Sequence, residues 1–234
     1  MNLRNIPSTD DAIAADIQTV VLDAADASSV FELHSQIGQV TPHGYLAPRQ
    51  ASDFERAFAD PCSIAAVGVR KDGQLIAYSI CQRAFTLPYP ENPHLSKIDL
   101  TITPLYVGMG TVVHPDFEGR LLMAQMLGLR RKLLIERRIR HVVGLVAIGN
   151  LKSIGNLLRV GAALLGFSED ETAMNYIAYG GEMLSRLDRQ TGNIMVSTDD
   201  VGRQEGMFNT GHVASGLRPD TKKQREFLFL PLIT

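Results

Sequence analysis

The stretch "TVVHPDFEGRLLMAQMLGLRR" (residues 111–131) decides the fold, because signals for a strand, a turn and a helix follow one another in it. The β-branched residues at its start favour a strand, and Gly119 indicates a turn. A long helix is predicted over 119–140 from an apolar stripe formed by Leu122, Met126, Leu129, Leu133 and Leu134. A turn of this kind presents helical N–H groups to an anion, so the loop 118–123 is a candidate ligand loop.

The segment before the turn predicts a long central strand. It covers residues 98–113 and is interrupted by Pro104 and by the triplet Gly108-Met109-Gly110. Proline and glycine inside a strand favour a bulge, or a strand end that separates from its neighbour. We therefore expect an irregular or splayed strand directly before the candidate loop.

The elements around this centre predict a mixed sheet. A hairpin is expected over 63–85, where two apolar runs flank Asp72-Gly73. Asn150 is expected to cap a helix. The other predicted strands are 17–22, 141–148 and 172–180, and the other predicted helices are one that begins after Asp26, one at 51–60 and one at 150–162. This order predicts an α/β fold of the α+β kind, in which antiparallel hairpins precede a parallel strand–helix–strand unit.

After Gly180 the sequence loses its periodicity and becomes rich in Gly, Asp and Thr. We expect a long irregular arm that ends in a strand at 225–234. The apolar end "FLFLPLIT" requires burial, either in its own sheet or on a second subunit. The predicted organisation is a domain over 1–185 and a C-terminal arm over 186–234, which packs on that domain or joins a homodimer.

The composition excludes several classes of protein. A hydrophobic fraction of 45% with 21% charged residues is typical of a globular protein, and a net charge of −2 gives no bias toward nucleic acid. No apolar run has the length of a membrane span and no apolar signal core is present, so we expect a cytoplasmic protein that does not contact a membrane. Cys62 and Cys81 lack the spacing of metal ligands, and we expect no metal.

A basic run, "RRKLLIERRIRH" (130–141), lies at the end of the predicted long helix. We interpret it as a solvated face that complements the helix C-terminal dipole. No aromatic residue is interleaved with the run, which argues against nucleic acid as a partner. A second interpretation is a landing site for an acidic acyl carrier protein.

The order of elements resembles the GCN5-related N-acetyltransferase (GNAT) superfamily over roughly residues 16–180. Four stretches carry the resemblance: "IQTVVLDAAD" (17–26), "VGVRKDGQLIAYSI" (67–80), "VVHPDFEGRLLMAQML" (112–127) and "NLKSIGNLLRVGA" (150–162). The resemblance implies transfer of an acyl group, most simply acetyl, from coenzyme A to an amine. It also implies that the pantetheine arm pairs along a splayed strand while the pyrophosphate binds at the loop 118–123.

The loop departs from the family's pattern Gln/Arg-x-x-Gly-x-Gly/Ala. Leu121 stands at the first signature glycine, Met123 at the second small residue, and Glu118 where glutamine or arginine is usual. Backbone donors do not depend on the side chain, so the loop still predicts a pyrophosphate site. The resemblance implies that cofactor contacts come from Glu118, Gly119, Arg120, Leu121, Leu122, Met123, Asn150 and Ser153, with Arg120 as a direct phosphate ligand.

The implied reaction needs an oxyanion donor, a base and, in some members, an acid. Backbone N–H groups of Val112 or Val113 are the expected oxyanion donors, which a strand bulge leaves unpaired. Three residues are candidates for the base, each with an alternative: Tyr106 packs in the sheet, His114 lies in a surface turn, or Asp99 faces solvent.

The family's acid is a tyrosine at the position of Leu157 here. Asn156 beside it can donate a hydrogen bond to sulfur but cannot deliver a proton. Either the thiolate leaves unaided, or another residue assists, or the protein does not acetylate.

Three functions stay open. The first is an acetyl-CoA-dependent N-acetyltransferase for a small-molecule or protein amine. The second is a transferase of longer acyl chains, from acyl-CoA or an acyl carrier protein, favoured by the bulky Leu121 and Met123. The third is an inactive binding or regulatory module, favoured by the missing tyrosine. The acceptor cannot be named, because acceptor pockets are built from variable loops.

Overall fold

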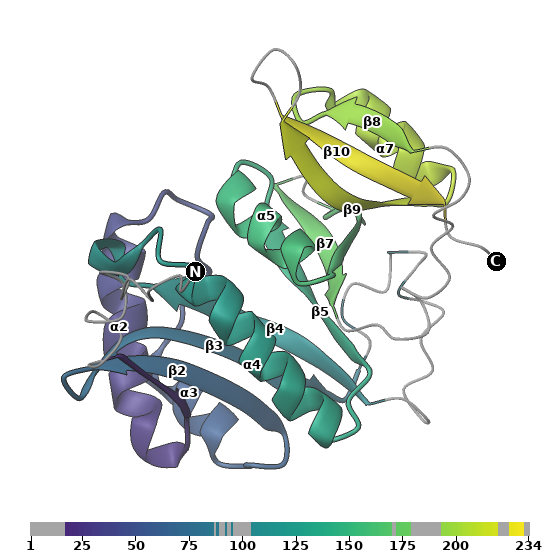
Figure 1. Ribbon diagram of the computed structural model, residues 1–234. Helices are drawn as coiled ribbons and strands as arrows, with labels where there is room; N and C mark the ends of the chain where they lie inside the picture. Colours follow the sequence, from purple (N-terminus) through teal and green to yellow (C-terminus); the bar gives the residue numbers. More distant parts are fainter. Residues whose placement is uncertain are drawn as a thin grey trace, which may run out of the picture.

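The computed structural model describes residues 17–86, 88, 92, 95, 104–169, 172–178, 193–219 and 225–231. The strands in this part of the chain form one ten-stranded sheet, in the order β1-β2-β3-β4-β5-β7-β6-β9-β10-β8 (Figure 1). The elements are β1 (Ile17–Val21), a 3-10 turn (Ala24–Asp26), α2 (Ala27–Val40), α3 (Ala51–Phe58), β2 (Ile64–Lys71), β3 (Gln74–Ala84), β4 (Leu105–Val113), a 3-10 turn (Pro115–Phe117), α4 (Leu122–Glu136), β5 (His141–Ala147), α5 (Leu151–Arg159), β6 (Ala163–Phe167), β7 (Ala173–Ala178), β8 (Ile194–Ser197), α7 (Val201–Asn209), β9 (His212–Pro219) and β10 (Arg225–Pro231).

The N-terminal half follows its local signals closely. The predicted hairpin is confirmed as β2 and β3, and Asp72 and Gly73 turn the chain with φ values of 50° and 79°. The helix predicted after Asp26 is confirmed as α2. Its capping bond belongs to the preceding 3-10 turn, where the Asp23 carboxylate accepts the N–H of Ala25 at 2.8 Å.

Alternation along the hairpin divides the core into two layers. Ala66 and Tyr78 belong to the cluster beneath α2 and α3, whereas Val67 and Ala77 belong to the cluster beneath α4. Figure 1 shows α2 and α3 on one side of these strands and α4 on the other. This arrangement leaves β4 between two packed layers, next to the first parallel strand.

β4 parts from β5 after a short parallel ladder. β4 pairs with β3 along its length, with an irregularity where Met109 lies between the partnered residues Gly108 and Gly110. The register between β4 and β5 covers only Leu105–Val107. The expected irregular, splayed strand is therefore confirmed in the described part of β4.

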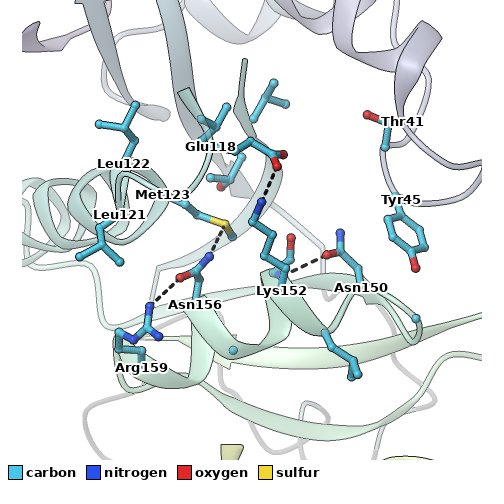
Figure 2. A pocket seen from close by; sticks show the side chains of 18 of the residues that line it. Thr41, Tyr45, Glu118, Leu121, Leu122, Met123, Asn150, Lys152, Asn156 and Arg159 are labelled. Carbon is cyan, nitrogen blue, oxygen red and sulfur yellow. Dashed lines mark hydrogen bonds and ion pairs between the residues drawn. The ribbon is translucent and has the colours of Figure 1, made fainter. Parts of the chain in front are cut away.

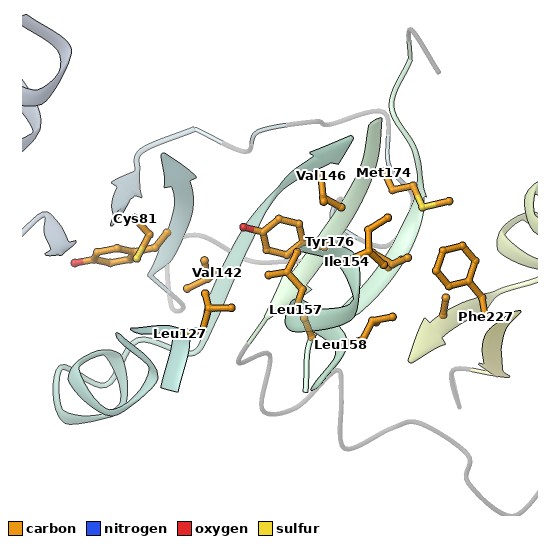
Figure 3. Close-up of a cluster of buried hydrophobic side chains, with 14 of the residues drawn as sticks. Cys81, Leu127, Val142, Val146, Ile154, Leu157, Leu158, Met174, Tyr176 and Phe227 are labelled. Carbon is orange, nitrogen blue, oxygen red and sulfur yellow. The ribbon is translucent and has the colours of Figure 1, made fainter. Parts of the chain in front are cut away.

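Tyr176 of β7 marks the point of separation. It pairs with Gly144 of β5, where an added Cβ would lie 2.7 Å from the Tyr176 hydroxyl and 2.8 Å from its Cζ. A Cβ at Gly108 of β4 would also lie 2.7 Å from this hydroxyl. The tyrosine thus lies across two glycines where the β4–β5 ladder ends, within the buried cluster of Figure 3.

The helices after β4 confirm one prediction and correct another. The helix predicted over 119–140 is shorter and covers Leu122–Glu136, because Leu121 has a left-handed backbone with φ 59° that cannot continue a helix. Asn150 caps α5 as predicted, since its side-chain oxygen accepts the N–H of Ser153 at 3.0 Å.

The irregular arm expected after residue 186 is wrong. The chain forms β8, α7 and β9 before the predicted final strand β10, and β9 joins β6 through Leu164 and Ala214. Sequence reasoning also missed β6. β6 and β8 have only five and four residues, so their periodicity is weak. The boundary expected between 185 and 186 falls outside the described residues.

The C-terminal strand is buried within its own sheet. Phe227 and Phe229 of β10 are 1% and 0% exposed, and the ring of Phe229 lies 5.1 Å from that of Phe208 in α7. The apolar C-terminal strand, whose need for burial suggested a subunit interface, is therefore buried by the chain itself. Within the described residues, no helix combines the length and apolar character needed to cross a membrane.

Candidate functional site

A cavity of about 1480 Å³ opens beside the parted end of β4. Five segments line it: the end of α2 with the following loop, the end of β4, the turn before α4, α5, and the β9–β10 hairpin. Nearly all predicted binding residues gather here, namely Val112, Val113, Glu118, Gly119, Leu121, Leu122, Met123, Asn150 and Ser153.

Arg120 is the exception among the predicted binding residues. It does not line the cavity, and its guanidinium stacks over the ring of Phe117 at 5.3 Å from the centroid. A cation held on an aromatic face is already partnered. The structure therefore gives no support to Arg120 as a direct phosphate ligand.

The N-terminus of α4 opens on the cavity without a side-chain cap. Leu121 occupies the N-cap position and forms no capping hydrogen bond. Gln125 donates its N–H to the Leu121 carbonyl at 3.0 Å, which leaves the N–H groups of the three residues before it without an intrahelical acceptor. Free donors at a helix N-terminus, together with the helix dipole, attract an anion.

Leu121 keeps the backbone shape of a glycine. Its φ of 59° and ψ of 12° lie in the left-handed region, which costs an L-residue about 1–2 kcal/mol. The side chain is 61% exposed, so burial offsets little of this cost. The loop thus retains the turn of a glycine-rich loop although it lacks the glycine, and strain of this kind is common where a ligand binds.

Lys152 neutralises the negative charge of Glu118. The Lys152 ammonium lies 2.5 Å from the Glu118 carboxylate, and Figure 2 shows this pair joining the turn before α4 to α5. Both side chains are about half exposed or more, so the pair can exchange for a ligand. Glu118 departs from the family's pattern, and its negative charge is therefore neutralised by Lys152 of α5.

Asn156 connects the two helices. Its amide donates to the Met123 sulfur at 3.3 Å and accepts from Arg159 at 3.0 Å, which places Arg159 near the start of α4 (Figure 2). The Asn156 amide, considered above as a donor to the leaving thiolate, thus bonds to a protein sulfur in this structure.

The charges around the cavity favour an anionic ligand. Among its described lining residues, one anion faces four cations, namely Glu118 against Lys152, Arg159, Arg218 and Arg225. Sequence reasoning missed all four cations. Arg218 lies in the segment read as an irregular arm, Arg225 begins the predicted final strand, and the other two stand on α5 without a motif.

The register of β4 decides which of its N–H groups face the open side. His114 donates its N–H to the Ile76 carbonyl at 2.8 Å, so this N–H and that of Val112, two residues earlier, point toward β3. The N–H groups of Thr111 and Val113 therefore point toward the parted side. Of the two expected oxyanion donors, Val113 faces the opening and Val112 does not, and Thr111 was missed.

Tyr106 lies away from the cavity, at the paired end of β4. Its side chain is 1% exposed, and its hydroxyl donates to the Cys62 carbonyl at 2.8 Å. Burial raises the pKa of this phenol. The structure thus shows the packing role, and a catalytic role for Tyr106 is not supported.

His114 follows the end of β4 but does not line the cavity. Its Nδ1 accepts the N–H of Asp116 at 3.3 Å, and its ring packs edge-on against Phe117. Its Nε2 lies 3.2 Å from the Gln36 amide nitrogen. These contacts match the surface-turn alternative. Asp99 lies outside the described residues.

Tyr45 is a cavity residue that the sequence did not reveal. A Cβ at Gly149 would lie 2.6 Å from the Tyr45 hydroxyl, so this glycine makes room for the phenol. Tyr45 extends from the loop after α2 toward the start of α5, near Asn150 (Figure 2). The cavity therefore has a phenol at this end, whereas Leu157 is buried in the core.

No model of a known protein family matches the chain, and no curated protein matches it in sequence. Solved structures do match. The PaiA N-acetyltransferase from Thermoplasma acidophilum, in complex with coenzyme A, aligns with a TM-score of 0.52 at 11% identity, over 69% of this chain and 97% of that chain.

Two further structures give the same result. Arabidopsis thaliana NAA60 in complex with acetyl-CoA aligns with a TM-score of 0.51 at 15% identity, over 69% of this chain and 96% of that chain. A GNAT-family acetyltransferase from Streptococcus pneumoniae aligns with a TM-score of 0.51 at 9% identity, with the same coverage of 69% and 96%. The chain therefore has the fold of the GCN5-related N-acetyltransferases.

Proposed function

We propose that the protein transfers an acyl group, most simply acetyl, from coenzyme A to an amine. One observation carries this proposal. A single cavity brings together the uncapped N-terminus of α4 and the unpaired side of β4, which are the two backbone surfaces that a pantetheine diphosphate requires.

The residues around the cavity fit a coenzyme A thioester. The free N–H groups of α4 suit a diphosphate, and the excess of cations on the rim suits the remaining charge. The open side of β4 offers hydrogen bonds to the pantetheine amides, in the manner of an added strand.

The same geometry supports attack of an amine on the thioester. Negative charge develops on the carbonyl oxygen during attack, and the N–H groups of Thr111 and Val113 face the space where it develops. Glu118 is the carboxylate among the described lining residues, and Lys152 holds it. We therefore do not assign proton removal from the amine to Glu118.

The position of the basic run favours coenzyme A over an acyl carrier protein. The cavity opens at the N-terminus of α4, whereas the run lies in its C-terminal half and beyond. Arg130 is buried, and Arg137 donates to the carbonyl of Pro61 at 3.2 Å and to that of Ile64. Part of the run thus serves the interior of the protein rather than a docking surface.

For the acceptor we propose only a chemical class. We propose a small-molecule or protein amine that enters beside Thr41 and Tyr45, on the wall opposite α5 (Figure 2). Loops of this kind vary freely between proteins of one fold, and they set the acceptor. Location in the cytoplasm and a homodimer are retained as proposals.

Calorimetry with coenzyme A, joined to mass analysis of an amine panel, tests the function. Gly119→Val is the decisive variant, because Gly119 has φ 79° and an added Cβ would meet nothing within 4 Å. The change strains the loop without a clash, and we expect at least about tenfold weaker binding of coenzyme A.

Gly211→Val is the matched control. Gly211 has φ 83° and equally open surroundings, but it lies between α7 and β9 and does not line the cavity. It should lower the melting temperature to a similar degree and leave the affinity unchanged. Equal affinities in both variants would refute the loop assignment, and tight binding without turnover would favour the inactive module.

A further inference from the structure

A buried arginine connects the core to the cavity through two hydroxyl groups. Arg130 of α4 is 1% exposed, and its Nη1 donates to the Ser79 hydroxyl at 2.9 Å. A guanidinium is costly to bury and is tolerated where hydrogen bonds hold it. Its position beneath β3 therefore makes the Ser79 oxygen an acceptor.

Ser79 connects Arg130 to Thr111 of β4. It is fully buried and stands opposite Thr111 in the β3–β4 register, with 2.8 Å between the two hydroxyl oxygens. Thr111 is partly buried and lines the cavity. A chain of two hydrogen bonds thus leads from a permanent cation to the cavity wall.

The chemistry of the three groups gives this chain a direction. A guanidinium only donates, so the Ser79 oxygen accepts from Arg130. Either hydroxyl of the Ser79–Thr111 contact at 2.8 Å has the chemistry to donate, and we take the arrangement in which Ser79 donates its proton to the Thr111 oxygen. The proton of the Thr111 hydroxyl is left for a group in the cavity, and polarisation by the charged end strengthens it as a donor.

We propose that the Thr111 hydroxyl donates a hydrogen bond to the acyl carbonyl oxygen, with Ser79 and Arg130 as positioning residues. This inference rests on the proposed acyl transfer. Thr111 then supplies two donors, its backbone N–H toward the parted side and its side-chain hydroxyl on the α4 side. Because arginine stays protonated over the working range of pH, the hydroxyl keeps its orientation throughout that range.

Thr111→Val removes the hydroxyl and keeps the backbone N–H and the side-chain shape. We expect kcat to fall about 10- to 100-fold, the value of a hydrogen bond to a charged group, with little change in KM. Thr111→Ser retains the hydroxyl and should restore most of the rate. A Thr111→Val enzyme with the wild-type kcat would overturn the inference and leave the transferase function standing.

Two further measurements separate the relay from general damage. Ser79→Ala should lower kcat less than Thr111→Val, and the double variant should match Thr111→Val alone, because Ser79 acts only through Thr111. Additive losses would overturn the relay.

The infrared carbonyl stretch of bound acetyl-CoA gives a readout without turnover. It should lie lower in the wild-type protein than in Thr111→Val. A lower stretch without product would support the relay and refute catalysis. An identical stretch in both proteins, or no binding of acetyl-CoA, would refute the relay.

Discussion

The two ends of β4 differ in their strand pairing and in what surrounds them. At the paired end, Leu105–Val107 bond to β5, and the side chain of Tyr106 is buried with its hydroxyl satisfied by a backbone carbonyl. At the parted end, Thr111–Val113 line a large cavity and bond only to β3. One strand thus combines a paired anchor with an open edge beside a cavity.

This difference teaches how a fold exposes backbone donors without losing stability. Unpaired strand edges are normally covered, because they invite unwanted pairing. Here the anchor holds β4 in place over three residues, and Tyr176 lies where further pairing with β5 would begin. The open edge is therefore a consequence of packing at the paired end, several residues away.

The largest expected effect comes from a change at the point of separation. In Gly144→Ala, the new methyl group would lie within 2.9 Å of three atoms at the outer end of the buried Tyr176 ring. We expect the free energy of unfolding to fall by about 1–3 kcal/mol, measured by urea denaturation. Coenzyme A affinity should fall as well, because the Tyr176 ring must move at the point where β4 and β5 separate.

Gly128→Ala in α4 serves as its control, since no atom lies within 4 Å of the added methyl. It should stabilise the protein by about 0.5–1 kcal/mol. Unaltered stability and affinity in Gly144→Ala would show that Tyr176 does not hold the strands apart.

A smaller effect is expected at the anchor. Tyr106→Phe removes the hydrogen bond to the Cys62 carbonyl and should cost about 1 kcal/mol of stability. Its kcat and pH profile should match the wild type, because the residue lies outside the cavity. Loss of the basic limb of the profile in this variant would return Tyr106 to the list of candidate bases.

The smallest effect is expected at the charged rim of the open end. Glu118→Gln removes the anion beside the α4 N-terminus and frees Lys152 for a phosphate. Coenzyme A should bind about threefold tighter at low salt, and the gain should shrink as salt screens the charges. Lys152→Met should act in the opposite direction, and tighter binding in both variants would contradict the role of the pair.

Sequence reasoning recovered the parts whose signals are local. The Asp72-Gly73 turn, the cap at Asn150 and the interruption of β4 by glycines are each encoded within a few residues. The turn before α4 was predicted for the same reason.

The missed features join distant residues. Glu118 and Lys152 are 34 positions apart. Tyr45 lies close to Gly149, which is even farther away in the sequence. No spacing rule connects such pairs, because only the folded structure brings them together. The N–H directions along β4 likewise depend on its register with β3.

The amino-acid sequence by itself determined the succession of strands and helices up to α5 and the turn that starts α4, since backbone preferences and apolar periodicity act between near neighbours. Only the tertiary structure decided which amides of β4 face the cavity, which charges surround it and that the C-terminal segment extends the same sheet. The physical reason is that register, burial and electrostatic contact are properties of residues that folding brings together, and they have no counterpart in the order of residues along the chain.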